Sequence, residues 1–321
     1  MSVFQSSIPV TTSTRLLDKY LLPKVALTVI TIASFIGTWL TMSTHGAGTW
    51  FQVVTRWLHL ISFATLAGGF MWKGLFIHLA KNQAQQPYFT PFTAASFARF
   101  RRLTQIILPI FVLTAVYDLF RFSGWGVGWL VEVEVSLLTI IALTIGIDAY
   151  GRRQKDPFAK RNLSRFILLL LLLDALVQAG FDVMLAQGGW VQPWFVRWLH
   201  LAAFGLWFGG AVWNIFITVP AARNLVSPPV VVSASQQLER FRIAVRFILP
   251  MLIVTGFIQA YRYVGFNLNA LTASTFGWLI LMKILLIGVL IIVFLTCPMW
   301  RACSPISGMC KLDDLYVKEH E

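Results

Sequence analysis

Two histidines occupy matching sequence contexts, and imidazole is a common protein ligand for transition metals. His59 lies in the segment RWLHL at 56–60, and His200 lies in the same segment at 197–201. Each histidine follows an arginine by three residues, so the arginine and the histidine of each segment lie on the same face of their helix. Copper and haem iron both accept imidazole. The two segments therefore predict a metal or cofactor site with His59 and His200 as the candidate ligands.

Other ionisable residues in apolar segments are candidates to support this site. Asp174 and Asp182 have no acidic counterpart 141 positions earlier, where the chain has Ala33 and Thr41, so they are candidate charge partners for an arginine. Alternatively, the arginines extend to lipid headgroups. Lys73, Glu134 and Lys283 are further charges for which the sequence suggests no role. The supporting candidates are Asp118, Asp174, Asp182, Arg56, Arg197, Arg121 and Arg262.

Sulfur-containing residues gather near the C-terminus. The candidate soft ligands are Cys297, Cys303, Cys310, Met299 and Met309. Thiolate and thioether ligands suit Cu(I), although free thiols are the simpler interpretation of three cysteines on the cytoplasmic side. Their spacing matches neither a zinc motif nor a redox motif. The sequence shows no phosphate loop, hydrolase triad or carboxylate dyad, so we do not expect an enzyme.

The composition indicates that membrane helices position these residues. Of the 321 residues, 57% are hydrophobic and only 12% are charged, whereas a soluble chain is roughly one-quarter charged. A spanning helix needs about 20 mainly apolar residues. The expected class is an all-α polytopic membrane protein with eight transmembrane helices, in contact with the lipid bilayer. The candidate spans are 22–42, 51–80, 100–122, 128–150, 166–186, 193–222, 241–264 and 276–298.

The basic residues set the expected orientation. The net charge is +13, but the lysines and arginines cluster in the segments between alternate spans, notably at 99–102, 152–165 and 240–246. Such clusters mark the cytoplasmic side of a membrane protein, so both termini should be cytoplasmic. This placement also argues against a nucleic-acid partner.

An internal repeat predicts two tandem four-helix units of the same orientation. Beyond RWLHL, the pairs Ala64/Gly68 and Gly205/Gly209 recur at the same offset, and small residues at this spacing allow close helix packing. A pseudo-two-fold axis along the membrane normal should relate the units. The expected parts are a cytoplasmic segment 1–21, a first unit 22–150, a basic linker 151–165, a second unit 166–298 and a cytoplasmic tail 299–321.

The second unit resembles the copper resistance protein D (CopD) family of bacterial inner-membrane proteins over about residues 195–295. The motifs that carry the resemblance are Gly209-Gly210, Ile248-Leu249-Pro250 and Thr275-Phe276-Gly277-Trp278 leading to Lys283. The first unit departs from the pattern at Glu134, where the family has a lysine. The resemblance implies copper homeostasis in the bacterial inner membrane, with a periplasmic copper-binding protein as a partner. It supports His59 and His200 as candidate copper ligands.

Three functions compete at this stage. In the first, His59 and His200 bind a copper ion near the outer surface and the protein translocates it. In the second, the two histidines hold a b-type haem for electron transfer, and the arginines bind its propionates. In the third, the chain is a membrane assembly subunit without a ligand. We expect copper handling, because the resemblance adds to the residue pattern.

Overall fold

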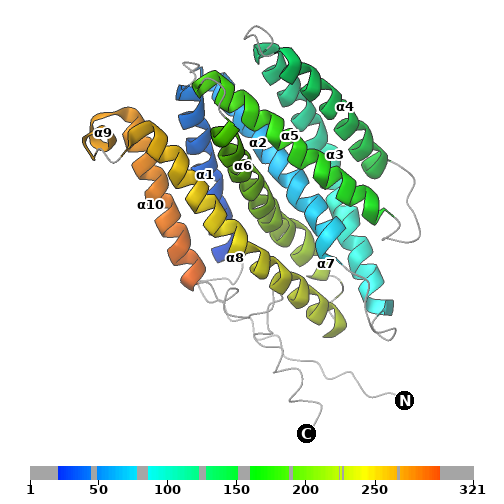
Figure 1. Ribbon diagram of the computed structural model, residues 1–321. Helices are drawn as coiled ribbons and strands as arrows, with labels where there is room; N and C mark the ends of the chain where they lie inside the picture. The colour runs from blue at the N-terminus through cyan, green and yellow to red at the C-terminus, as the bar shows by residue number, and fades with distance from the viewer. Residues whose placement is uncertain are drawn as a thin grey trace, which may run out of the picture.

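The structure is a computed structural model that describes residues 21–44, 49–77, 86–122, 128–150, 160–187, 191–223, 225, 228–265 and 268–296. All elements in these segments are helices, and successive long helices run in alternating directions (Figure 1). Eight of them are long and apolar enough to cross a membrane. The predicted class, an all-α polytopic membrane protein with eight spans, is confirmed. The spanning helices are α1 (Leu21–Thr44), α2 (Trp50–Met71), α3 (Gln86–Phe122), α4 (Gly128–Tyr150), α5 (Arg161–Gln187), α6 (Val191–Val212), α8 (Pro228–Val264) and α10 (Thr275–Thr296).

Two of these helices extend beyond the segments expected from hydropathy. Helix α3 begins before the span predicted at 100–122, and α8 begins before the span predicted at 241–264. Hydropathy detects only the apolar part of a helix, whereas the polar residues before it have ordinary helix propensity. The basic clusters at 99–102 and 240–246 therefore lie on helices and not in loops. The short helices α7 (Val219–Arg223) and α9 (Leu268–Ala273) precede α8 and α10.

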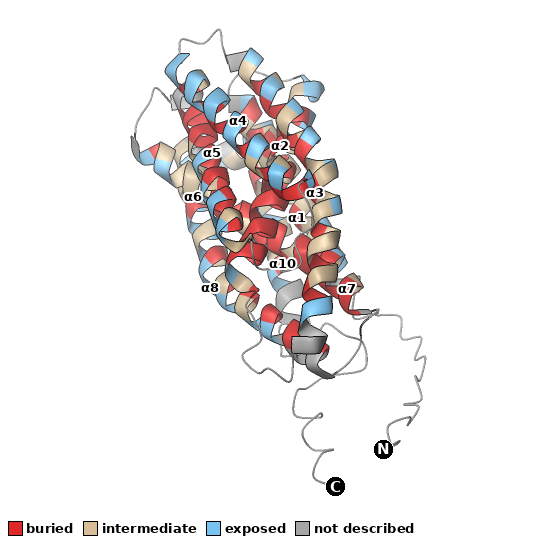
Figure 2. Ribbon diagram, turned by 90° about the vertical axis from the view of Figure 1, so that its right-hand side faces the viewer, coloured by how far each residue is buried: buried red, intermediate tan, exposed pale blue. Residues whose placement is uncertain are grey.

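The centre of the bundle is formed by α2, α5 and α6. Their inward faces are buried, while large apolar side chains of α4, α8 and α10 are exposed, as expected for a surface that faces lipid (Figure 2). Helices α2 and α6 cross where Gly68 and Gly209 meet. A Cβ atom added at either glycine would overlap the backbone of the other helix, so both positions require glycine. The small-residue pairs predicted close packing, and these two helices provide it.

Matching irregularities follow this crossing on both helices. A π-helical turn spans Trp72–Phe76 after α2, and another spans Trp213–Thr218 after α6. The rings of Trp72 and Trp213 stack with centroids 6.0 Å apart and planes 6° apart. These residues are 141 positions apart, as the two histidines are. The contacts are consistent with two tandem units, and the division into units and their boundaries stay predictions.

Candidate functional site

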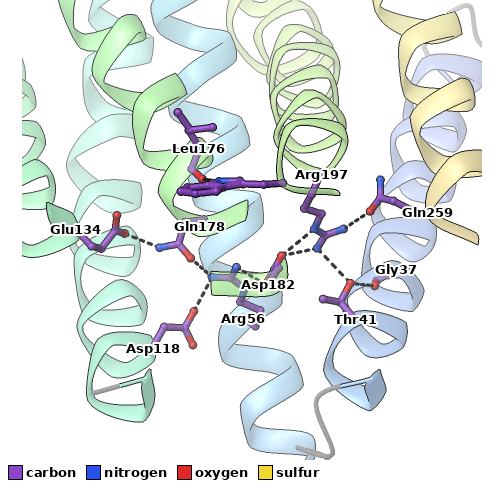
Figure 3. A network of polar contacts seen from close by, with 11 residues as sticks. Gly37, Thr41, Arg56, Asp118, Glu134, Leu176, Gln178, Asp182, Arg197 and Gln259 are labelled. Carbon is purple, nitrogen blue, oxygen red and sulfur yellow. Dashed lines mark hydrogen bonds and ion pairs between the residues drawn. The ribbon is translucent and has the colours of Figure 1, made fainter. Parts of the chain in front are cut away.

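Arg56 of α2 lies at the centre of a buried polar cluster (Figure 3). Its guanidinium donates to Asp118 of α3 and to Asp182 of α5, each over 3.0 Å, and it also donates to Gln178 of α5. Only 8% of its side chain is exposed. Charge-assisted hydrogen bonds of this kind are stronger than those between neutral groups, and here they join three helices around one cation.

Arg197 of α6 extends the same cluster towards α1 and α8. Its guanidinium donates to Asp182 over 2.8 Å, to Gln259 over 3.1 Å and to Thr41 over 3.2 Å. Asp182 therefore bridges the two arginines, as Figure 3 shows. The interpretation that Arg56 and Arg197 extend to lipid headgroups is wrong, because their charges are paired inside the bundle. The side chain of Arg121 lies outside the described residues.

The two histidines make the same hydrogen bond to neighbouring helices. The Nδ1 atom of His59 lies 3.3 Å from the Thr114 hydroxyl on α3, and the Nδ1 atom of His200 lies 3.0 Å from the Thr255 hydroxyl on α8. Both threonine hydroxyls also donate to a backbone carbonyl of their own helix. Each hydrogen bond holds its imidazole in one orientation, so the Nε2 atom is the nitrogen left for a ligand.

His59 lines a small enclosed site. The residue is 3% exposed, and its ring stacks on Phe111 with centroids 4.8 Å apart. Among the described residues, its Nε2 atom has no hydrogen-bond partner. A cavity of about 20 Å³ is lined by His59, Asp174, Gln178 and both arginines of the cluster. Roughly 10–15 Å³ is enough for one water molecule, so this cavity has room for a water molecule or a single ion.

A pair of buried carboxyl groups adjoins this small cavity. Glu134 of α4 and Asp174 of α5 are fully buried and lie close enough together for their charges to interact. The Gln178 amide donates to Glu134 over 2.5 Å, but no donor among the described residues contacts Asp174. A carboxylate oxygen only accepts, so a hydrogen bond between the two groups requires a shared proton. Without that proton, the pair carries uncompensated negative charge.

His200 lines a much larger and more basic cavity. This cavity measures about 360 Å³ and lies between α1, α6, α8 and α10. Arg197, Arg262 and Lys283 line it, and Asp182 is the only acidic residue that lines it in the described part of the chain. Ala33, Gly37 and Lys283 occupy the positions that correspond in the predicted repeat to Asp174, Gln178 and Glu134. The two histidines therefore make the same kind of hydrogen bond to a threonine but lie in opposite electrostatic environments.

A second buried ion pair lies closer to the other end of the bundle. The Lys73 ammonium contacts both carboxylate oxygens of Asp148 on α4, over 2.6 and 2.7 Å. Its side chain also lies near the rings of Phe70 and Phe97. The corresponding residue Asn214 instead donates to the Gly210 carbonyl of its own helix. This pair links the π-helical turn after α2 to α4 and is separate from the histidine sites.

The structure brings most of the sequence candidates to one level of the bundle but not into one cavity. His59 and His200 line neighbouring cavities that have Thr38, Thr41, Leu60, Arg197 and Leu201 in common, and a single site shared by both rings stays a prediction. Sequence reasoning missed the carboxyl pair, because Glu134 and Asp174 lie on different helices. The described residues contain no group of three or more His, Cys, Asp or Glu residues placed to hold a metal ion. Cys297, Met299, Cys303, Met309 and Cys310 lie outside the described residues.

Comparison with known proteins finds similarity to one family over part of the chain. The CopD family model, described as copper resistance protein D, matches residues 235–303. The match covers most of α8 together with α9 and α10, and includes Thr255, Gln259 and Lys283. The resemblance expected over 195–295 is confirmed from residue 235 onwards, but the helix that carries His200 lies outside the match. No curated protein and no solved structure matches the chain.

Proposed function

We propose that this chain, a membrane protein of copper resistance with a CopD match at residues 235–303, binds copper at His59 and passes it through the bundle. The observation that carries the proposal is the set of unsatisfied ligand atoms at the small cavity. The Nε2 atom of His59 and both carboxylate oxygens of Asp174 lack a described partner, and both residues line a space of ionic size. Imidazole is a good copper ligand, and the carboxylate supplies negative charge.

The charge balance around His59 favours a cation. Arg56 and Arg197 are matched by Asp118 and Asp182 in the ion-pair cluster. Glu134 and Asp174 then remain as additional acidic groups, and two adjacent carboxylates in an apolar interior repel one another. A shared proton or a bound cation relieves this repulsion. The bound cation therefore acts as the transported substrate, and the carboxyl pair as the group that attracts it.

The charge balance around His200 does not favour copper. Lys283 replaces the acidic residue found near His59, and Arg197 and Arg262 also line the cavity. We therefore assign copper binding to His59 and not to His200. Asp118 and Asp182 are engaged with arginines, as the sequence suggested for Asp182, and are not left to bind the metal. Asp174 takes that role in the proposal.

The haem alternative is supported less well than copper binding. It required both imidazoles at one ligand, whereas His59 and His200 line different, though neighbouring, cavities. The arginines expected to bind propionates already bind carboxylates of the protein. An assembly subunit without a ligand would have no use for an unsatisfied histidine beside two carboxyl groups. Copper handling is the function that these residues support best.

The remaining parts of the proposal concern the setting of the protein. We place it in the bacterial inner membrane with both termini cytoplasmic, on the basis of its basic clusters. Copper would then arrive from the periplasm, delivered by a periplasmic copper-binding protein. The cysteines and methionines of the segment 297–310 would receive it on the cytoplasmic side, because sulfur ligands suit Cu(I).

Copper retention by the purified protein tests the proposal. The protein is loaded with Cu(I) under reducing conditions and desalted, and its metal content is measured by mass spectrometry. We expect Asp174→Asn to lower retention by roughly tenfold or more, because a single lost ligand charge is worth at least ~1.4 kcal/mol. Glu132→Gln is the matched control, since Glu132 is an exposed carboxylate on α4. Equal retention by the two variants would contradict the assignment.

A further inference from the structure

The large cavity beside His200 has the dimensions of a site for an organic molecule. Pockets for small ligands measure roughly 300–1,000 Å³, and this one measures about 360 Å³. On α10 its lining extends from Phe276 to Leu290, which corresponds to about 21 Å along a helix. A single ion does not need such a space. An extended molecule fits it better.

The two ends of the large cavity differ in chemistry. The upper end, where α6 and α10 begin in Figure 1, combines the polar residues Thr41, Arg197, Gln259 and Arg262 with apolar ones such as Val196 and Phe276. The lower end is lined by apolar residues, including Val29, Ile30, Leu249, Ile287 and Leu290. A molecule that complements this lining has a polar head and a long apolar tail.

The cavity lies next to lipid-facing surface between α8 and α10. Ile253 and Phe257 of α8 and Ile284 of α10 line it, although they are 39%, 60% and 57% exposed. In the other half of the bundle, α3 packs directly along α4, whereas α8 and α10 are not in comparable contact. A molecule dissolved in the bilayer can therefore enter sideways between these two helices.

Lys283 gives the cavity a cation for which the described residues provide no counter-ion. Its Nζ atom lies over Gly37 of α1, where an added Cβ would be 2.9 Å away. Among the described residues, no carboxylate forms an ion pair with Lys283. The acidic lining residue Asp182 is bound by both arginines. An ammonium group within a span is costly unless it is paired, so an anionic group from outside the chain would stabilise it.

We propose that the cavity between α1, α6, α8 and α10 binds an anionic lipid from the bilayer, with its charged headgroup at Lys283 and its acyl chain in the apolar lower end. The headgroup enters between α8 and α10, and His200 and Arg262 line the space around it. This inference goes beyond copper binding at His59 and does not depend on it. It assigns the basic histidine site a ligand of opposite charge to copper.

Lipid retention by the intact protein tests the inference. The protein is placed in nanodiscs of phosphatidylglycerol and phosphatidylcholine in equal amounts, released into mild detergent, and measured by native mass spectrometry. We expect the unmodified chain to retain phosphatidylglycerol in preference to phosphatidylcholine. Lys283→Gln should lower this preference by roughly tenfold or more, because it removes a charge-assisted contact. Arg102→Gln, which removes an exposed cation outside the cavity, should leave the preference unchanged.

A second variant tests the position of the ligand independently of charge. Ile253→Trp places a large ring at the gap between α8 and α10 and should reduce retention of the lipid while Lys283 is still present. Equal retention of both lipids by the unmodified chain would overturn the inference, as would an undiminished preference in Lys283→Gln. A Soret band in the purified protein would replace the lipid with haem as the occupant.

Discussion

The sites of His59 and His200 share a backbone frame but differ in charge and in packing. Each imidazole is held by a threonine on the next long helix, and each has an arginine one turn away. Around His59, α4 and α5 contribute Glu134 and Asp174, which form a buried acidic pair. Around His200, α10 contributes Lys283, and α1 contributes only small side chains at the corresponding positions. The two sites thus differ in the residues that the flanking helices contribute, and these residues decide whether a site favours a cation or an anion.

The His59 and His200 sites also differ in how tightly the helices pack around them. The His59 site is small, because residues of α1, α2, α5 and α6 pack closely around a cavity of only about 20 Å³. The His200 site is open, because α8 and α10 leave about 360 Å³ between them and α1. A small acidic site suits an ion without its hydration shell, whereas an open basic site suits an amphiphile. Under the two proposals made above, the two similar helical frames serve separate tasks.

The largest expected effect comes from breaking the ion-pair cluster on its better buried side. Arg56→Gln leaves Asp118 and Asp182 with one cation fewer, and breaking a buried ion pair costs roughly 3–5 kcal/mol. Arg197→Gln should cost less, because Arg197 contacts a single carboxylate and is twice as exposed. Thermal unfolding in detergent measures both variants. Equal losses of stability would mean that the two arginines are equivalent.

The next effect concerns the acidic pair. Glu134→Lys gives the His59 site the charge that Lys283 gives the His200 site. We expect copper affinity to fall by roughly a hundredfold, about 2.7 kcal/mol, because a cation then replaces an anion beside the metal. A competitive titration with a chromophoric Cu(I) chelator measures the change. Unchanged affinity would show that copper binds elsewhere.

A smaller effect is expected at the contact common to both sites. Gly68→Ala places a methyl group against the backbone at Gly209 and should destabilise the protein by roughly 1–3 kcal/mol, since both backbones must shift. Gly146→Ala on α4 is the matched control, because its added methyl group meets nothing within 4 Å. The unfolding temperatures of the two variants provide the test. If Gly146→Ala were the more harmful change, close packing of α2 on α6 would not explain the result.

The smallest effect is expected at the two threonines. Thr114→Val and Thr255→Val each remove the hydrogen bond to an imidazole, which contributes about 1 kcal/mol. Thr114→Val should weaken copper binding by a few-fold, and Thr255→Val should leave it unchanged. The same chelator titration distinguishes the two variants. A loss on Thr255→Val alone would reverse the assignment of the sites.

Sequence reasoning recovered the features that depend on local pattern. The eight spans follow from hydropathy, and the matched hydrogen bonds of His59 and His200 agree with an offset of 141 that is visible in the chain. Asp182 was a candidate partner for an arginine, but its contact with both arginines could not be predicted, because it depends on the packing of α5 against both α2 and α6. The pairing of Glu134 with Asp174 was missed for the same reason. A sequence lists intramembrane charges, whereas helix packing decides which of them meet.

The central claim is that the His59 site binds copper and the His200 site does not. Cu(I) binding by purified His59→Ala and His200→Ala, measured side by side by chelator competition, tests it most directly. We predict that His59→Ala loses roughly tenfold or more in affinity, since it removes a metal ligand, and that His200→Ala binds as the unmodified chain does. Comparable losses in both variants, or a loss in His200→Ala alone, would contradict the claim.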